Sequence, residues 1–599
     1  MVAGKLMDSS RIIQIIMVLI IALAIILWSY RKLAWRVPVL GASTLDKTDK
    51  RIVWGLMLIY LMISGINLGL RTNFGMWHGD DPSDSLEIRF AGPTQISSVA
   101  YYYGLGSGSL NLTYYTSVGG TGNVPLTNNS SLYKWTTVQL PDNPDVVGMK
   151  LMVSPPIELR HLALYDHAGH YLNNYTIIAS DGSDVSGLMS QNPPSAVQNT
   201  SLSSMYFDEI YYGRTAWEYL HGISPYAWVH PPLGILIVGL GILLFGMNPF
   251  GWRIMPAISG ILMIPVIYLF AKKIFNDRKI AIVSTVLMMT DFMHFSVCRM
   301  ASIDSSSTLF VLLELMFFYD YARQRLAGNE ANAFKALFFA GLFFGMGMSC
   351  KWDALFTIPL LLGLLIYVEL IRRRPSVLVF IPALAKVALS MLIVPLAVYC
   401  LSYLPYFSHD PVSNFVKFIY NLQGYMVGYH TGLVGHATHP YASSWWGWPL
   451  LTKPLSVFFW QDNSTKIASS IVLMGNPAIW WVGIPAFFAG VGFAVYKRDF
   501  RGIYLTLAIL TLYLPWTVIG RLSFNYYFYV VTPLWILMIS YVLWQISQIW
   551  PKESNRLIIG YLAICVFLFI LFYPAISGLA VSRDYVVHYL LWFSPAWNF

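Results

Sequence analysis

Residues 557–577 read LIIGYLAICVFLFILFYPAIS, an apolar run without a single charged side chain. A helix needs about 20 apolar residues to cross a bilayer, so this run predicts a membrane-spanning helix. Similar runs recur through the 599-residue chain and predict twelve spans in all. The other eleven are 12–30, 52–70, 253–271, 280–298, 305–320, 335–350, 353–371, 377–401, 469–496, 502–519 and 524–546. The shorter apolar segment 233–247 predicts a helix at the membrane interface.

The composition also indicates a chain that is mostly dissolved in lipid. Charged residues make up 11% of the sequence and hydrophobic residues 56%, whereas soluble domains carry about 25% charged residues. Aromatic residues, at 16%, exclude a disordered chain. The formal net charge of +9 comes from basic residues in short loops, which indicates membrane topology and not a nucleic-acid partner. The four cysteines show no CxxC spacing, so we expect packing thiols and no disulfide framework or zinc site.

Basic residues predict the orientation of the spans. Twenty-one lysines and arginines, from Arg31 to Arg556, fall in one set of short loops, and the positive-inside rule makes that side cytoplasmic. Both termini and the long polar segments then lie outside. Because no A-x-A-like site follows the first apolar run, we expect a retained anchor and not a cleaved signal peptide.

Residues 71–206 form one long polar stretch with few basic residues. Strand-like runs separated by Gly-, Asn- and Pro-rich turns predict an inserted extracytoplasmic β-sandwich or jelly roll, and the pattern resembles a galactose-binding-like module. The predicted strands are 86–91, 95–103, 109–116, 132–140, 148–154 and 157–166.

Ionisable and aromatic residues gather at the predicted outer face. An ionisable group at the bilayer centre costs at least about 2.5–3.5 kcal/mol, so each one in or near a span asks for a reason. Taken singly, Arg299 and Asp304 fit an interfacial ion pair, and Lys351 fits a side chain that snorkels to the headgroups. The tryptophans fit an aromatic belt, and the acidic pair at 208–209 fits a solvated turn. These explanations weaken together because all the outliers face one side.

A common site explains them better, since cations suit a lipid phosphate and a carboxylate can activate a hydroxyl. The candidates at this stage are Asp208, Glu209, His230, Arg299, Asp304, Lys351, His439, Trp445 and Arg521.

Several short motifs occur in the order found in the protein O-mannosyltransferase family. They are Asp208-Glu209, HPPLG at 230–234, RMASID at 299–304, CKW at 350–352, HPYAS at 439–443, GNPAIWW at 475–481 and RLSFNYY at 521–527. The chain resembles that family over residues 52–70 and 207–599. The loop 402–468 is too short for a β-trefoil (MIR) domain, which favours the prokaryotic type. Ile235 and Asp353 depart from the family pattern, which bears on donor and acceptor binding.

The resemblance implies a polytopic α-helical membrane protein of the GT-C glycosyltransferase fold, with about twelve spans and the inserted β-sandwich. The predicted divisions are two N-terminal helices (1–70), the β-sandwich (71–206), a first outer loop with the Asp-Glu motif (207–252), a membrane core (253–401), an outer loop with His and Trp (402–468) and a four-span C-terminal region (469–599).

The resemblance also implies the chemistry: mannose passes from polyprenyl-phosphate-mannose to Ser or Thr hydroxyls of exported proteins, with inversion, at the outer face of the plasma membrane. Asp208 would be the base, and Glu209 would contact the acceptor backbone or nearby cations. Arg299, Arg521 and Lys351 would hold the donor phosphate. The supporting residues would be His230, Asp304, His439, Trp445 and Tyr526. We expect no metal and no cofactor.

Three alternatives remain open at this stage. An enzyme of the same fold could use another lipid-linked sugar or a lipid or glycan acceptor, because none of the motifs indicates which sugar the enzyme recognises. A transporter would be expected to show paired half-sequences, and no internal repeat is visible. A surface adhesin would use the β-sandwich, but twelve spans exceed what an anchor needs.

Overall fold

The structure is a computed structural model that describes Ala24 and residues 45–71, 75–127, 132–189, 200–372, 377–405, 415–433 and 437–599. Apart from Ala24, the predicted span 12–30 lies outside the described residues. The chain divides into two compact units. The membrane unit comprises Met1–Ile66, Glu218–Gly239 and Ile254–Phe599, and the β unit comprises Asn67–Trp217 and Leu240–Arg253.

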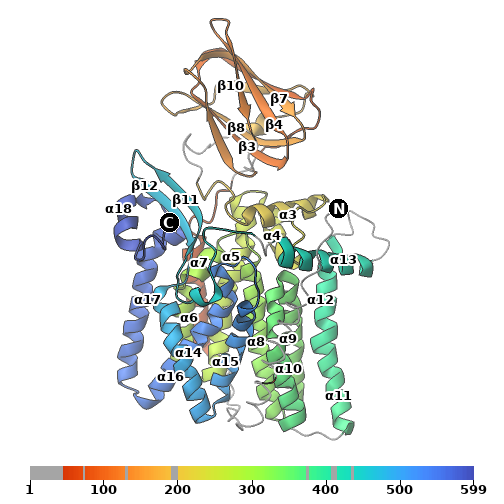
Figure 1. The fold of residues 1–599 in the computed structure, drawn as a ribbon, viewed down its shortest axis with the longest axis vertical. Helices are drawn as coiled ribbons and strands as arrows, with labels where there is room; N and C mark the ends of the chain where they lie inside the picture. Colours follow the sequence, from red (N-terminus) through yellow and green to blue (C-terminus); the bar gives the residue numbers. More distant parts are fainter. Residues whose placement is uncertain are drawn as a thin grey trace. The chain divides into compact units, whose positions relative to one another are not determined.

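Two five-stranded antiparallel sheets form most of the β unit (Figure 1). One has the strand order β1-β8-β3-β6 with β9 on β8, and the other has the order β10-β2-β7-β4-β5. The hydroxyl of Tyr103 in β3 donates to the carbonyl of Leu126 in β5 (2.8 Å) and accepts from the amide of Leu110 in β4 (3.2 Å). These bonds join the two sheets as a β-sandwich. The strands are β1 (Trp77–Gly79), β2 (Ser85–Gln95), β3 (Ser98–Gly106), β4 (Ser109–Thr116), β5 (Thr121–Leu126), β6 (Trp135–Gln139), β7 (Asp145–Ser154), β8 (Ile157–Tyr165), β9 (Tyr171–Leu172) and β10 (Tyr175–Ala179).

All six predicted strands are present, although the second begins at Ser98 and not at Gln95, which ends β2. The structure adds β1, β5, β9 and β10. The sequence of β5, TGNVPL, has the Gly and Pro of a turn, which hid the strand. Its Gly122 has a packing role, because a Cβ there would lie 2.1 Å from Cζ of Tyr114.

The membrane unit is helical, and seven segments in the described part of the chain are long and apolar enough to cross a membrane. The number is eight if the bent pair α6 and α7 counts as one span, so the chain is a multi-pass membrane protein and twelve spans stay a prediction. The seven segments are α5 (Pro249–Phe275), α9 (Glu330–Cys350), Trp352–Leu370, Ile381–Ser402, α14 (Pro477–Lys497), Asn525–Ile549 and α17 (Glu553–Ser577). Three more helices, α2 (Lys47–Gly65), α8 (Asp304–Leu326) and α15 (Phe500–Tyr513), match predicted spans but do not meet this standard. The short apolar helix α4 (Leu233–Phe245) matches the predicted interfacial helix.

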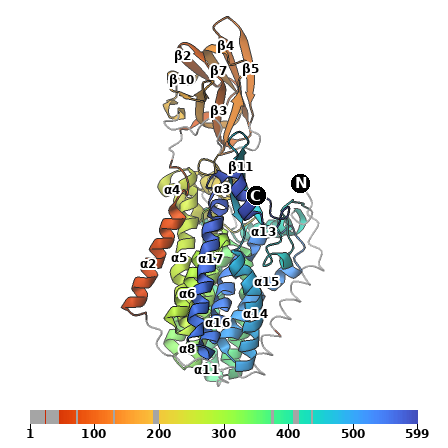
Figure 2. The same ribbon diagram turned by 90° about the vertical axis from the view of Figure 1, so that its left-hand side faces the viewer.

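Helices α8 and α9 pack along each other, and Figure 2 shows α14, α16 (Thr532–Ile549) and α17 running alongside one another. Aspartates begin several of these helices. The side chains of Asp46, Asp277 and Asp499 accept backbone hydrogen bonds in the first turns of α2, α6 and α15. Such caps satisfy amide groups that have no partner inside the helix.

Two predicted spans need correction. The span 280–298 is broken into α6 (Arg278–Met289) and α7 (Phe292–Cys298), bent by 59°, because Asp291 caps a new helix. The predicted span 469–496 begins too early, since Ile467–Leu473 is strand β12, paired with β11 (Leu455–Asp462). Asn476 caps α14 and Pro477 occupies its first turn, so the helix starts there.

Two glycines let α9 approach a neighbouring segment closely. A Cβ on Gly341 would lie 1.7 Å from the carbonyl oxygen of Ser390, and a Cβ on Gly345 would lie 2.7 Å from Cα of Pro395. The contacted segment consists of a π-helical turn, Leu389–Ile393, and α12, Val394–Ser402. Small residues four positions apart form the close contact, as in many membrane helix pairs.

Candidate active site

The Asp208-Glu209 motif lies in the β unit, at the start of α3 (Glu209–His221). Phe207, just before it, has φ of 50°, in the left-handed region that non-glycine residues rarely adopt. The carbonyl of Asp208 accepts from the amides of Tyr211 and Tyr212 (3.0 and 3.2 Å), which fixes the backbone of Asp208. The side chain of Asp208 is half-buried, whereas Glu209 is fully buried. Adjacent carboxylates therefore have different surroundings, in line with two separate roles.

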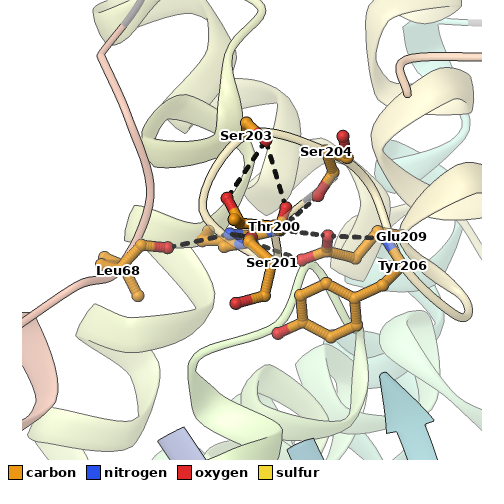
Figure 3. A network of polar contacts seen from close by, with 8 residues as sticks. Leu68, Thr200, Ser201, Ser203, Ser204, Tyr206 and Glu209 are labelled. Atoms are coloured by element: carbon orange, nitrogen blue, oxygen red, sulfur yellow. Dashed lines mark hydrogen bonds and ion pairs between the residues drawn. The ribbon is translucent and has the colours of Figure 1, made fainter. Parts of the chain in front are cut away.

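Glu209 forms a buried ion pair with Arg253, and Figure 3 shows the surrounding network. Oε1 accepts from Nε of Arg253 and Oε2 accepts from Nη2, both at 2.7 Å. The other N–H groups of Arg253 donate to carbonyl oxygens, those of Leu68 (3.1 Å), Ser201 (2.6 Å) and Ser204 (2.9 Å). All five donors of the guanidinium are thus used. The pair holds together the start of α5, the segment 200–209 and the chain that follows α2.

The sequence predicts Glu209 as a contact for the acceptor backbone or for a nearby cation, and the structure bears on the cation alone. The contacts that the structure records for the Glu209 carboxylate include a cation, Arg253, which bonds both oxygens, and the backbone amide of Tyr206, which donates to Oε2 at 3.2 Å. Glu209 therefore has a structural role in this network, and the catalytic roles of Asp208 and Glu209 stay predictions.

A second cluster, which we call the cation cluster, lies in the membrane unit around Lys351. Nζ of Lys351 lies 2.6 Å from Oδ1 of Asp304 and 3.7 Å from Oδ2 of Asp353. It also lies 5.0 Å from the ring centroid of Tyr527 and 5.7 Å from that of Tyr526. Burial opposes the charge of Lys351, but the carboxylates outweigh it, and the pKa of the ammonium lies above its ordinary value. Lys351 is therefore charged at any physiological pH.

Arg521 joins the same cluster through His430. Nη1 of Arg521 donates to Nδ1 of His430 (2.6 Å), and Nη2 donates to the hydroxyl of Tyr527 (2.7 Å). Nε2 of His430 donates to the carbonyl of Val229 (2.8 Å), which leaves Nδ1 as the acceptor and fixes the tautomer. The segment Asn525–Val531, a 3₁₀ helix, carries Tyr526 and Tyr527 beside Lys351.

The two histidines of the cluster are neutral. Burial, then the charge of Arg521, lowers the pKa of His430 to about 4. Burial, then His430 and the two cations, lowers the pKa of His230 well below its ordinary value. The imidazole rings are 5.2 Å apart between centroids. The cluster can therefore offer two fixed cations to a bound anion, beside two uncharged imidazole rings.

Arg299 has other partners. Its Nη1 donates to the carbonyls of Ser64 and Ile66 (2.7 Å for the second), at the C-terminal end of α2, and its guanidinium lies 4.8 Å from the ring centroid of Phe295. A cation on the last carbonyls of a helix is favourable. Among the described residues Asp304 pairs with Lys351, and not with Arg299 as an interfacial ion pair would require, and it accepts from the hydroxyl of Ser302 (2.6 Å). The assignment of Arg299 to the donor phosphate stays a prediction.

The remaining predicted residues lie in the loop 402–468 and in the 3₁₀ segment. His439 is exposed, accepts from the amide of Tyr441 (3.2 Å) and lies against the ring of Phe524 at 5.1 Å. The carbonyl of Trp445 accepts from the hydroxyl of Tyr513 (2.6 Å). Tyr526 is buried and packs against Tyr527 at 4.8 Å.

The cluster thus brings together Lys351, Arg521, Asp304, His230 and Tyr526 of the predicted set. Sequence reasoning missed His430 and Tyr527 as site residues, and it missed Arg253 altogether. Tyr527 lay within a quoted motif, RLSFNYY, but His430 lies in no motif and had no local signal. In the described residues, no group of three or more His, Cys, Asp or Glu is arranged to hold a metal ion.

The described part of the chain thus combines a multi-pass helical bundle with a cluster of fixed cations, neutral histidines and carboxylates. The family profile "Dolichyl-phosphate-mannose-protein mannosyltransferase" matches residues 243–409, and the profile "C-terminal four TMM region of protein-O-mannosyltransferase" matches residues 415–597. Together they cover more than half of the sequence, and the chain belongs to the protein O-mannosyltransferase family.

Individual relatives agree with this placement. The polyprenol-phosphate-mannose–protein mannosyltransferase of Mycobacterium tuberculosis is 26% identical over 447 residues, which cover 64% of this chain and 85% of that protein. The protein of the same name from Corynebacterium glutamicum is 26% identical over 473 residues, covering 67% and 89%. The solved S. cerevisiae protein O-mannosyltransferase Pmt1-Pmt2 complex bound to the sugar donor has a similar fold, with a TM-score of 0.57 and 15% identity over 66% of this chain and 89% of that chain.

Proposed function

We propose that the chain transfers mannose from polyprenyl-phosphate-mannose to Ser or Thr hydroxyls of exported proteins. The observation that carries the proposal is the cation cluster, in which Lys351 and Arg521 are fixed beside tyrosine rings and neutral histidines. Fixed cations suit the phosphate of a lipid-linked sugar, and they stabilise charge that develops on the phosphate as it departs. The names of the mycobacterial and corynebacterial relatives support this donor and a protein acceptor.

The proposed reaction is a single displacement. The acceptor oxygen forms a bond to the anomeric carbon of mannose, and the bond from that carbon to the phosphate oxygen breaks with inversion. The bonding electrons stay with the phosphate, which leaves as polyprenyl phosphate. Asp208 takes the proton of the acceptor hydroxyl. Because the side-chain cations Lys351 and Arg521 are placed to contact the phosphate directly, we propose that the reaction needs no metal and no cofactor.

Transfer by the purified protein in detergent or nanodiscs tests the proposal. Synthetic polyprenyl-phosphate-mannose and a Ser/Thr peptide should give a mannosylated peptide, identified by mass spectrometry, and EDTA should leave the rate unchanged. The same lipid carrying another sugar, and a lipid or glycan acceptor, test the alternatives. Transfer only with one of these, and none with mannose and peptide, would replace the proposed reaction.

The donor side of the proposal gives a prediction for Arg521. Replacing Arg521 by Ala should raise the KM for the lipid donor by roughly 10–150-fold, since a lost charge-assisted hydrogen bond costs about 1.5–3 kcal/mol. Lys should rescue poorly, because a single ammonium cannot reproduce the planar fork that now reaches His430 and Tyr527. Arg498→Ala, at an exposed position after α14, is the matched control. An unchanged donor KM in Arg521→Ala would remove Arg521 from the donor site.

We also propose that the protein lies in the plasma membrane with the β unit and both termini outside. The twenty-one basic residues in one set of short loops support this orientation. A cysteine at Val118, which is 91% exposed, should react with a membrane-impermeant maleimide in intact cells. A cysteine at the exposed Lys552 should react only after permeabilisation. The parent chain gives the background from its own cysteines, and labelling of Lys552→Cys in intact cells would reverse the orientation.

A further inference from the structure

The cation cluster holds one carboxylate more than Lys351 needs. Asp304, at 2.6 Å, already neutralises the ammonium, yet Asp353 lies 3.7 Å from the same nitrogen and is also buried. The hydroxyl of Ser307 donates to Oδ1 of Asp353 at 3.3 Å, a long bond from an uncharged group. A buried carboxylate without its own cation is costly. The position of Asp353 therefore indicates a function that offsets the free-energy cost of burying its carboxylate.

The charges of the cluster cancel when it is empty. Lys351 and Arg521 contribute two positive charges, Asp304 and Asp353 contribute two negative charges, and His230 and His430 are neutral. Without Asp353 the cluster would carry a net positive charge. An anion bound there thus meets less attraction than the two cations alone would give.

The proposed reaction changes the charge of its own ligand. The donor is a phosphodiester with one negative charge. When the bond to the anomeric carbon breaks, the electron pair remains on the phosphate oxygen and the product is a phosphomonoester. Its second ionisation has a pKa of about 6, so the product carries close to two negative charges at pH 8.

We propose that Asp353 discriminates between donor and product by charge, disfavouring the doubly charged lipid phosphate and so promoting its release. The inference rests on the proposed function, which places the donor phosphate at Lys351 and Arg521. A phosphate oxygen in hydrogen-bond contact with Lys351 would lie within roughly 7 Å of the Asp353 carboxylate, since such contacts measure about 2.8 Å. Between the effective dielectric constants of about 20 near a protein surface and about 80 in water, repulsion at this range weakens binding by roughly 3-fold to 50-fold, on the order of tenfold, for each negative charge on the ligand.

The test compares two inhibitors that differ in charge alone. One is polyprenyl phosphate, and the other is its methyl ester, a phosphodiester with one fixed charge. Both are measured at pH 8 against mannosyl transfer by the full-length protein. Asp353→Asn keeps the shape and the bond with Ser307. It should lower the Ki of the methyl ester roughly tenfold and the Ki of polyprenyl phosphate roughly a hundredfold, so that the ratio of the two constants changes about tenfold.

Two control variants separate charge from packing. Asp353→Glu keeps the charge and should keep the wild-type ratio. Asp320→Asn removes a carboxylate that pairs with Lys273 at 2.8 Å. Asp320 lies on α8, as Asp304 does, but sixteen residues or roughly 24 Å further along the helix. This variant should also keep the ratio. If both Ki values of Asp353→Asn fall by one factor, or neither changes, the inference is wrong.

The unmodified protein gives a second measurement that needs no variant. It should bind the methyl ester at least as tightly as polyprenyl phosphate, although the latter carries more charge for the cations to attract. Markedly tighter binding of polyprenyl phosphate would overturn the inference. An absence of both transfer and inhibition would instead overturn the proposed function, so the two failures can be told apart.

Discussion

Replacing Asp208 by Asn should lower kcat by roughly 10²–10⁴-fold while the protein still binds its lipid donor, because a positioned general base contributes about that factor. A Ser or Thr hydroxyl is a weak nucleophile until its proton is being removed, and Asn has the shape of Asp without its basicity. The backbone of Asp208 is fixed by its bonds to the amides of Tyr211 and Tyr212, so the substitution should leave the fold intact. Single-turnover transfer from labelled donor measures the chemical step, and donor binding is measured separately.

Asp181→Asn, at an exposed position of the β unit, is the matched control and should keep the wild-type rate. Near wild-type turnover of Asp208→Asn with a peptide acceptor would mean that another group takes the proton. His439 would then be the first residue to change, because its side chain is exposed in the loop 402–468.

Replacing Arg253 by Met should destabilise the β unit by about 3–5 kcal/mol, the usual cost of removing one partner of a buried ion pair. Glu209 would remain fully buried and would lose both of its guanidinium bonds. Three backbone carbonyls would lose a donor as well. A domain has about 5–15 kcal/mol of stability, so much of it would be lost. Thermal unfolding in detergent and limited proteolysis of the β unit measure the effect.

Two further variants test the reason for this loss. In Arg253→Met combined with Glu209→Gln no charge is left buried, so part of the stability should return. Transfer activity should not return with it, because the anchor beside Asp208 is gone. Arg89→Gln breaks a pair with Glu87 whose side chains are 60% and 49% exposed, and it should cost no more than about 1 kcal/mol. Equal losses for Arg253→Met and Arg89→Gln would show that burial does not set the cost.

The sequence predicts the elements better than it predicts their partners. Alternating apolar residues located the longer strands of the sandwich, and long apolar runs located the helices. The sequence predicts residues 469–473 (SSIVL) as the start of a span, because a buried strand and a buried helix look alike over so few residues. The pairing of β11 with β12 became visible only in the structure.

Site residues show the same division. The motifs singled out Lys351 and Arg521, which the structure places in one cluster, and their role at the donor phosphate stays a prediction. Arg299 belongs to a motif too, but its recorded partners are the carbonyls of Ser64 and Ile66, more than 200 positions away. Backbone carbonyls carry no sequence signal, so helix capping by a distant arginine cannot be seen in the sequence. The link between Glu209 and Arg253 escaped prediction for a similar reason, since 44 positions separate them.

The close contact of α9 with the segment Leu389–Ser402, at Gly341 and Gly345, limits which positions of the chain tolerate substitution. In the apolar stretch of Ile381–Ser402, only 17% of the residues are buried within the protein. In a membrane, most of these side chains would contact lipid tails. Lipid tails accept one apolar side chain as readily as another. Lipid gives helices no hydrophobic drive to associate, and the segment holds its place by contact. Its lipid-facing side is therefore free to change over many generations, whereas even one added methyl group on either glycine would displace a whole helix. We therefore expect substitutions to be tolerated at the lipid-facing positions of Ile381–Ser402 and excluded at Gly341 and Gly345.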